Sequence, residues 1–246
     1  MQYFRLALSF LTRLPIPCPM IEGKGALARA MSFFPWVGLI VGALAGGVFY
    51  GADWLLPRPL AAFLAVLTSV LVTGGLHEDG LADCADGLGA RGDRDQRLLV
   101  MRDSRSGTYG VLALLFSVGL RCAALSAAPS ALAGGLALLA AHTIARALIP
   151  AAMQIIPPAR PDGLGHMAGQ PDATIAAIAM GQGLLLCLLC LGAAAPYVVM
   201  LSVALVLGII HLARRLLGGH TGDVLGAIEQ AGEIATLLVA AGFWTC

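Results

Sequence analysis

The long apolar stretches of this chain constrain its fold more than any other feature. Hydrophobic residues make up 59% of the 246 residues and charged residues only 12%, and the mean hydropathy is +0.86. One soluble core of this size cannot bury so many apolar side chains, whereas a lipid bilayer can surround them. We therefore predict an all-α, polytopic integral membrane protein.

Hydropathy predicts about seven transmembrane helices, or six if the short second one is re-entrant. A helix needs about 20 apolar residues to cross a bilayer, so the uncharged stretch 173–213 is too long for one span, and Pro196 marks the turn inside it. We expect residues 1–246 to form a single membrane-embedded domain. The predicted spans are 31–51, 59–76, 109–128, 132–156, 173–194, 197–213 and 225–244.

The distribution of charge predicts the orientation of these spans. Four basic residues precede the first span, whereas the next loop holds only Asp53 and Arg58. Basic residues accumulate on the cytoplasmic side, so we expect a cytoplasmic N-terminus. Loops 77–108, 157–172 and 214–224 then face the cytoplasm too. The four early basic residues are Arg5, Arg13, Lys24 and Arg29.

The first fourteen residues are apolar but interrupted by Arg5, and no small-residue cleavage pattern follows them. We predict an amphipathic helix at the membrane interface rather than a signal peptide. A short extra buried helix is an equally good interpretation. The six cysteines form no disulfide framework, and Cys187 and Cys190 are expected to serve packing. A net charge of +1 gives no reason to expect a nucleic-acid partner.

An acidic motif, LHEDGLADCADG over residues 76–87, follows the second predicted span. In a helix Asp79, Asp83 and Asp86 project from one face, because they are spaced i, i+4 and i+7. Three adjacent carboxylates repel one another unless a cation neutralises them, and oxygen ligands favour Mg²⁺, Mn²⁺ or Ca²⁺. We predict a metal site here; the alternative is a solvated acidic helix start.

A second polar motif, MRDSRSGTYG over residues 101–110, leads into the third predicted span. Arg102, Arg105, Ser104 and Thr108 offer cations, hydroxyls and helix-start amides, which together bind phosphate. The alternative for the arginines is positive-inside anchoring at a helix end. That alternative is the favoured one for Arg91, Arg94 and Arg97 upstream.

A third motif, GGHTGDVLGA over residues 218–227, opens the last predicted span. Thr221 and Asp223 lie at this opening, and Asp223 is expected to be the N-cap of the helix. Glu229 and Glu233 continue into the membrane, where an unpaired carboxylate costs about 2–3 kcal/mol. They need buried partners, for which the candidates are Arg121, His142 and Arg146. We predict that Arg146 pairs with Glu229 or Glu233.

These motifs resemble those of the cobalamin synthase family, also called adenosylcobinamide-GDP ribazoletransferases. The resemblance rests on GGLHEDGLADCADG (74–87), MRDSR (101–105) with GTYG (107–110), and TGDVLGA (221–227), and it extends back to FLTRLP at 10–15. Small departures occur at Glu78, Cys84 and Ser106. None of them removes a predicted ligand, although the added charge of Glu78 has no assigned role.

The resemblance implies a Mg²⁺-dependent transferase at the bacterial inner membrane. A hydroxyl of α-ribazole, or of its 5′-phosphate, would attack the corrinoid-linked phosphorus of adenosylcobinamide-GDP, and GMP would leave. Mg²⁺ would be held by Asp79, Asp83 and Asp86, and the base would be Asp83, Asp103 or His77. The implied substrate contacts are Arg102, Arg105, Ser104, Thr108, Arg160, Thr221 and Asp223.

Two other classes of protein stay open at this point. CDP-alcohol phosphotransferases and aromatic prenyltransferases also hold Mg²⁺ and a pyrophosphate on aspartate-rich helices. A cation or proton transporter could use the same carboxylates as a relay. The placement of seven of the fourteen acidic residues in 77–108 argues against a transporter, because transporters more often place polar groups at the bilayer midplane. Oligomeric state is left open.

Overall fold

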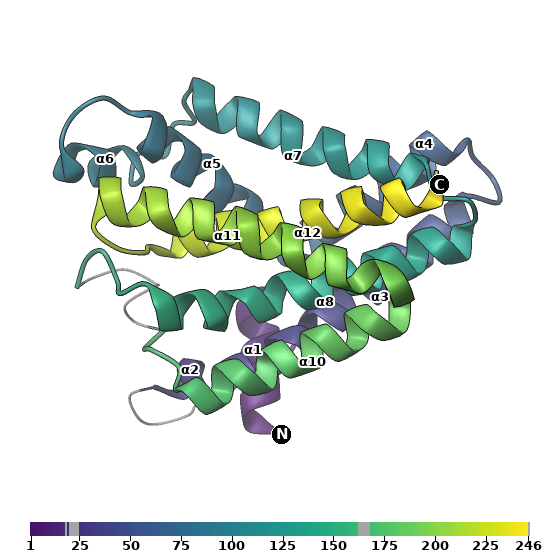
Figure 1. The fold of residues 1–246 in the computed structure, drawn as a ribbon, viewed down its shortest axis with the longest axis horizontal. Coiled ribbons are helices and arrows are strands. Elements are labelled where there is room, and N and C mark those ends of the chain that lie inside the picture. The colour runs from purple at the N-terminus through teal and green to yellow at the C-terminus, as the bar shows by residue number, and fades with distance from the viewer. Residues whose placement is uncertain (18, 20–24, 162–167, 246) are drawn as a thin grey trace.

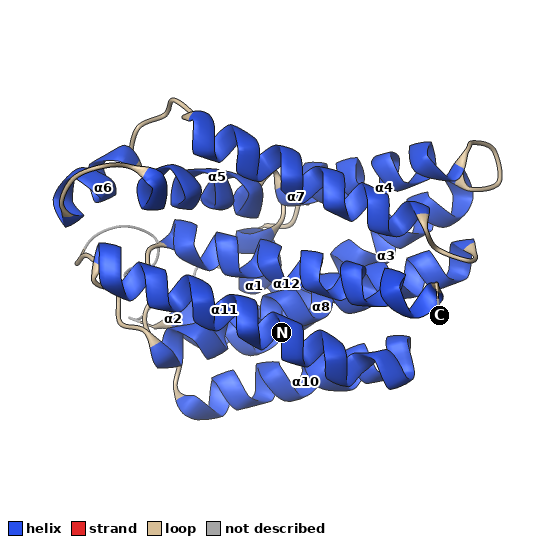
Figure 2. Ribbon diagram, turned by 45° about the horizontal axis from the view of Figure 1, so that its top comes forward, coloured by secondary structure: helices blue, strands red, loops and turns tan. Residues whose placement is uncertain are grey.

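The computed structural model describes residues 1–17, 19, 25–161 and 168–245. Within these ranges the chain is helical and forms no strand (Figure 2). Its helices are α1 (Gln2–Leu11), α2 (Ala26–Ala30), η1 (Met31–Phe33), α3 (Phe34–Ala52), α4 (Arg58–Thr73), α5 (Leu76–Gly89), α6 (Arg94–Val100), α7 (Thr108–Ser126), α8 (Ala131–Ile155), α10 (Ala173–Leu191), η2 (Gly192–Ala194), α11 (Ala195–Leu217) and α12 (Gly222–Trp244). The predicted all-α class is confirmed.

The long helices lie beside one another as a bundle, and α1 runs across them (Figure 1). Helices α8 and α12 form its centre, since α8 packs against α3, α10 and α12. Most of the apolar surface of these two helices is buried within the protein, whereas α7, α10 and α11 expose many large apolar side chains. This distribution fits a bundle whose outer helices face lipid.

In the described part of the chain, five segments are long and apolar enough to cross a membrane, which confirms a multi-pass protein. One of them, Ala173–Leu217, contains α10 and α11, which run in opposite directions (Figure 1). Helices α4 and α5 could form a further, broken span. The exact number of spans and the side of the N-terminus stay predictions.

The second predicted span is shorter than expected. It ends at Thr73 rather than 76, and α5 continues at an angle of 90° to α4. Gly74 and Gly75 make this bend with φ angles of 68° and 69°, which residues other than glycine rarely adopt. The bend turns the acidic motif onto a separate helix. The predicted loop 77–108 therefore contains α5 and α6.

Other boundaries also differ from the sequence prediction. The loop 214–224 shrinks to 218–221, because α11 extends to Leu217 and α12 begins at Gly222. Residues 162–167 of the loop 157–172, together with Lys24, Cys18 and Cys246, lie outside the described residues. The four described cysteines are free, as expected: Cys84, Cys122, Cys187 and Cys190.

The first residues form the predicted helix, α1, which buries Ala7, Leu8 and Leu11. These side chains join the core that contains Phe34 and Ile149. The helix packs on α2 and α3, so its apolar face is covered by protein. Its other face remains exposed.

Helices α3 and α8 approach closely through glycine. A Cβ atom added at Gly38 would lie 2.1 Å from the His142 carbonyl oxygen, whereas a Cβ atom at Gly47 of the same helix meets nothing within 4 Å. The α3–α8 contact therefore requires the absence of a side chain at Gly38. Small residues at such crossings let membrane helices pack backbone to backbone.

Gly38→Ala should lower the stability of the protein by about 1–3 kcal/mol, because α3 must move away from α8. We expect this loss as a lower thermal unfolding temperature in detergent, measured by size-exclusion chromatography after heating. Gly47→Ala is the matched control on the same helix and should leave the unfolding temperature nearly unchanged. Equal behaviour of the two variants would contradict the close contact.

Candidate functional site

The acidic motif lies where α5 crosses α12. A Cβ atom added at Gly80 would lie 3.1 Å from the Asp223 Cα atom, and one at Gly226 would lie 3.2 Å from the Gly80 Cα atom. Two glycines therefore let the helices touch at this point. The contact brings the start of α12 against the acidic face of α5, although the two motifs are more than 130 residues apart.

A cavity of about 320 Å³, the first cavity, opens beside this crossing. Its polar lining comes from His77, Asp79, Arg160 and Asp223, and its apolar lining includes Phe10, Leu11, Met31, Phe34 and Ile149. An apolar pocket with a few converging polar groups is the usual form of a ligand site. The structure thus brings four predicted site residues together from α5, α12 and the loop after α8.

Carboxylates crowd this end of the bundle. Asp83 lies one turn beyond Asp79 on α5 and experiences the charges of Asp79, Asp223 and Asp86. Among the described residues, the basic group nearest to Asp223 is Arg160, whose Nη2 lies 4.0 Å from Oδ2. This excess of negative charge is the condition under which a divalent cation binds. Asp79, Asp83 and Asp223 offer only oxygen donors, the ligand type that Mg²⁺ prefers. Among the described residues, however, these three carboxylates do not form a group whose ligand atoms all lie within 4.8 Å of one another.

Asp86 has a different environment from the other carboxylates of the motif. It is buried, and its Oδ2 and Oδ1 accept hydrogen bonds from the backbone N–H groups of Gly107 and Gly110, at 2.7 and 2.9 Å. These bonds fix the N-terminus of α7 to α5 and satisfy amides that the helix itself cannot pair. Asp86 is thus a structural contact in this fold. Its role as a metal ligand stays a prediction.

The start of α12 corrects one prediction. Thr221 is the N-cap, since its hydroxyl accepts the hydrogen bond of the Val224 N–H at 3.3 Å. Asp223 lies in the first turn instead, and its Oδ2 accepts a hydrogen bond from the Thr221 hydroxyl at 3.1 Å. The helix begins earlier than predicted, so the cap moves to Thr221. The Asp223 carboxylate is thereby available to the first cavity.

The segment 103–108 lies away from the first cavity, whose lining includes none of its residues. Asp103 and Arg105 pair with each other at 2.7 Å, and the Arg105 side chain is 86% exposed. The hydrogen bonds from Arg105 lower the pKa of Asp103 to about 2. Ser104 and Thr108 are also exposed. The substrate contacts predicted for Ser104, Arg105 and Thr108 therefore stay predictions.

Arg102 lines a separate cavity of about 320 Å³, in which Arg94 and Arg160 also take part. Arg160 borders both this cavity and the first one. Cations from α6, from the following segment and from the loop after α8 therefore gather beside the acidic cluster. Such a pair of opposite charges is suited to a metal-bound phosphate.

Two arginines upstream of the second motif have structural roles. Arg94 donates to the carbonyl oxygens of Leu217 and Ala159, and Arg97 donates to that of Leu88 at 2.6 Å. The backbones of Ala159 and His220 also pair, at 2.8 Å. Arg94 thus ties α6 to the two loops that carry Arg160 and Thr221. The positive-inside anchoring predicted for these arginines stays a prediction.

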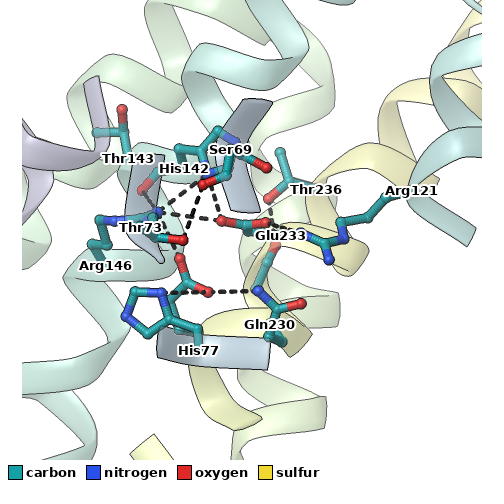
Figure 3. A network of polar contacts seen from close by, with 12 residues as sticks. Ser69, Thr73, His77, Arg121, His142, Thr143, Arg146, Gln230, Glu233 and Thr236 are labelled. Carbon is teal, nitrogen blue, oxygen red and sulfur yellow. Dashed lines mark hydrogen bonds and ion pairs between the residues drawn. The ribbon is translucent and has the colours of Figure 1, made fainter. Parts of the chain in front are cut away.

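A buried ion network, the most polar part of the bundle interior, lies deeper along α12 (Figure 3). Arg146 Nη1 lies 2.6 Å from Glu229 Oε1 and 3.2 Å from Glu233 Oε1. Arg121 Nη1 lies 2.8 Å from Glu233 Oε2. All four side chains are at most 3% exposed. The prediction that Arg146 pairs with Glu229 or Glu233 is confirmed, and Arg146 in fact lies close to both carboxylates.

Glu78 gains a role that its sequence position did not reveal. Its Oε1 accepts hydrogen bonds from Arg121 Nη2 at 3.1 Å and from Gln230 Nε2 at 3.2 Å. The Ser117 hydroxyl donates to Gln230 Oε1 at 2.8 Å. Sequence reasoning missed Gln230 and Ser117, although a glutamine inside an apolar helix is itself a signal of a buried partner.

The network extends to two histidines. His142 Nδ1 lies 2.5 Å from Glu233 Oε1, and His77 Nδ1 lies 3.4 Å from Glu229 Oε2. His142, Glu229 and Glu233 are close enough to hold a metal ion. Arg146 and Arg121 already compensate these carboxylates, so we interpret the group as an ion network. His77 also lines the first cavity, and it therefore connects the network to the candidate site.

Comparison with known proteins shows the family to which this chain is related. A family model described as cobalamin-5-phosphate synthase matches residues 3–241. The adenosylcobinamide-GDP ribazoletransferase of Bradyrhizobium diazoefficiens is 50% identical over 97% of this chain and 93% of its own length. The enzyme of the same name from Sinorhizobium medicae is 42% identical over 94% of this chain and 92% of its own. No solved structure matches the chain.

Arg146→Met should destabilise the protein by about 3–5 kcal/mol, because it leaves Glu229 and Glu233 with uncompensated buried charge. We expect a strongly reduced yield of monodisperse protein and a lower thermal unfolding temperature in detergent. Arg215→Met is the control, since Arg215 is an exposed arginine near the end of α11. Normal yield and stability of Arg146→Met would show that the network is not required for folding.

Proposed function

The chain belongs to the cobalamin-5-phosphate synthase family, and we propose that it transfers the adenosylcobinamide-phosphate group of adenosylcobinamide-GDP to α-ribazole or α-ribazole 5′-phosphate. The products are adenosylcobalamin or its 5′-phosphate, and GMP. This is the final assembly step of cobalamin biosynthesis. The observation that carries the proposal beyond family membership is the first cavity, where Asp79, Asp223 and Arg160 converge.

The reaction is a substitution at phosphorus. An oxygen–phosphorus bond forms between the ribazole hydroxyl and the corrinoid-linked phosphate, the bond to the GMP phosphate breaks, and the hydroxyl proton passes to a base. Such transfers depend mainly on positioning and on neutralising charge. The enzyme must therefore hold two substrates in line and compensate the pyrophosphate.

We propose that Asp79, Asp83 and Asp223 hold Mg²⁺, with Asp86 bracing the helix that carries two of them. When bound, the ion would supply a Lewis acid that neutralises the pyrophosphate oxygens. Arg160 lines the first cavity, and Arg102 lines the neighbouring cavity that Arg160 also borders. We propose that these two cations compensate the negative charge of the leaving GMP. Thr221 orients Asp223 through its hydroxyl hydrogen bond.

The geometry narrows the choice of base. Asp103 accepts a proton poorly, because Arg105 holds the pKa of its carboxyl at about 2 and the pair lies away from the first cavity. His77 and Asp79 line that cavity, and Asp83 lies one turn from it. We propose that the proton passes to one of these three groups.

We also propose a location for the site. Multi-pass insertion is supported by the apolar helices. Helices α5 and α6, with the loops 157–161 and 218–221, gather at one end of the bundle (Figure 1). Excess basic charge before the first span supports a location of this end at the cytoplasmic face of the bacterial inner membrane. Both soluble nucleotide substrates would then reach it directly.

The purified protein in nanodiscs should release GMP from adenosylcobinamide-GDP only when Mg²⁺ and an acceptor are both present. The acceptor is either α-ribazole or α-ribazole 5′-phosphate. Asp79→Asn and Asp83→Asn should reduce this rate by about 100-fold or more, since each removes a charge from the metal set. Asp53→Asn is the control and should retain activity, because Asp53 lies between α3 and α4 and lines neither of the two cavities.

Three results would contradict parts of this proposal. Release of CMP or of free pyrophosphate from other donors would favour the alcohol-phosphotransferase or prenyltransferase classes. Full activity in the presence of a metal chelator would show that the reaction does not require Mg²⁺. Full activity of both asparagine variants would show that this carboxylate cluster is not the metal site, and it would leave the proposed transferase function unchanged.

A further inference from the structure

A second cavity of about 660 Å³ adjoins the first one, and the function so far described does not use it. It lies between the end of α1, the α4–α5 turn and Leu114 of α7. Its volume is within the range of about 300–1,000 Å³ that is typical of ligand sites. Phe10, Leu76 and Asp79 line both cavities. The two spaces therefore meet at the carboxylate that we assign to the metal.

The cation of the second cavity is Arg13. Its backbone N–H donates to the Val72 carbonyl oxygen at 2.7 Å, which ties the end of α1 to the end of α4. Its side chain lies across Gly74, where an added Cβ atom would come within 2.5 Å of Nε. Among the described residues its guanidinium forms no hydrogen bond or ion pair. Arg13 thus presents an uncompensated charge to the cavity.

Glu78, which lines the same cavity, carries an unpaired acceptor atom beneath the cavity surface. Glu78 is 8% exposed, and its Oε1 is satisfied by Arg121 and Gln230. Its Oε2 is buried and has no hydrogen-bond partner. A buried carboxylate oxygen without a donor costs free energy, so a ligand hydroxyl that donates to it would be favoured.

We propose that the second cavity binds the acceptor nucleotide, with its 5′-phosphate on Arg13 and a ribose hydroxyl donating to Glu78 Oε2. A ribose phosphate carries an anion that can pair with Arg13 and hydroxyl groups that can donate to the Glu78 carboxylate. The inference rests on the proposed function and deepens it by separating the two substrates. The donor occupies the first cavity, and the acceptor approaches from the opposite side of Asp79, as an in-line substitution requires.

This assignment makes Arg13 a determinant of acceptor specificity. The guanidinium contacts the phosphate of α-ribazole 5′-phosphate. α-Ribazole lacks this phosphate and so cannot make the contact. Hydrogen bonds between charged groups are stronger than neutral ones, so the phosphorylated acceptor should bind more tightly. The chemistry at the reacting hydroxyl is the same for both acceptors.

The test compares the KM values of the two acceptors at saturating donor and Mg²⁺. Arg13→Gln should raise the KM for α-ribazole 5′-phosphate by about 10- to 100-fold, and should change the KM for α-ribazole less than twofold. Arg13→Lys, which keeps the charge, should recover part of the preference. Arg5→Gln is the control on the preceding helix α1, because Arg5 bonds to the Pro17 carbonyl and does not line the cavity.

Each outcome has a distinct meaning. An equal rise in both KM values, or a lowered unfolding temperature of Arg13→Gln, would show that Arg13 only supports the fold and would overturn the inference. Unchanged KM values for both acceptors would place the phosphate elsewhere. Failure of the wild-type protein to release GMP with either acceptor would overturn the proposed function itself, whereas activity with both acceptors but no effect of Arg13→Gln would overturn the inference alone.

Discussion

The buried ion network is the interaction on which the rest of this structure depends. Arg121 and Arg146 would each be costly inside an apolar bundle, and so would the carboxylates of Glu78, Glu229 and Glu233. Paired, they compensate one another and join four helices, α5, α7, α8 and α12. The register of each helix is thereby specified, because sliding any of them would leave a charge unpaired.

That fixed register carries the functional site. Glu78 and His77 belong to the network, and Asp79 is the next residue on the same helix. The network thus positions the start of α5, and the Gly80–Gly226 crossing then brings Asp223 against it. The site carboxylates owe their arrangement to pairs formed deeper in the bundle. This agrees with a general pattern in which catalytic groups are held by rigid elements behind them.

The site combines two neighbouring cavities with charges of opposite sign. The first has carboxylates from α5 and α12 with Arg160 beside them, and the second has Arg13 and the unpaired oxygen of Glu78. Asp79 is common to both. A transfer between two substrates needs such a shared point, where the attacking and leaving groups lie on opposite sides of one phosphorus.

The sequence by itself determined the membrane class, the helical fold and most helix boundaries within a few residues, and it supplied the candidate residues for the chemistry. Those properties follow from local hydropathy and residue type, and Arg146 could be paired with Glu229 and Glu233 because buried charge demands a partner. The tertiary structure alone decided that Asp86 holds the start of α7, that Thr221 caps α12, that Glu78 meets Arg121 and that Arg13 faces a cavity. Apart from the local cap at Thr221, these contacts join segments distant in sequence, and helix packing rather than residue spacing sets them.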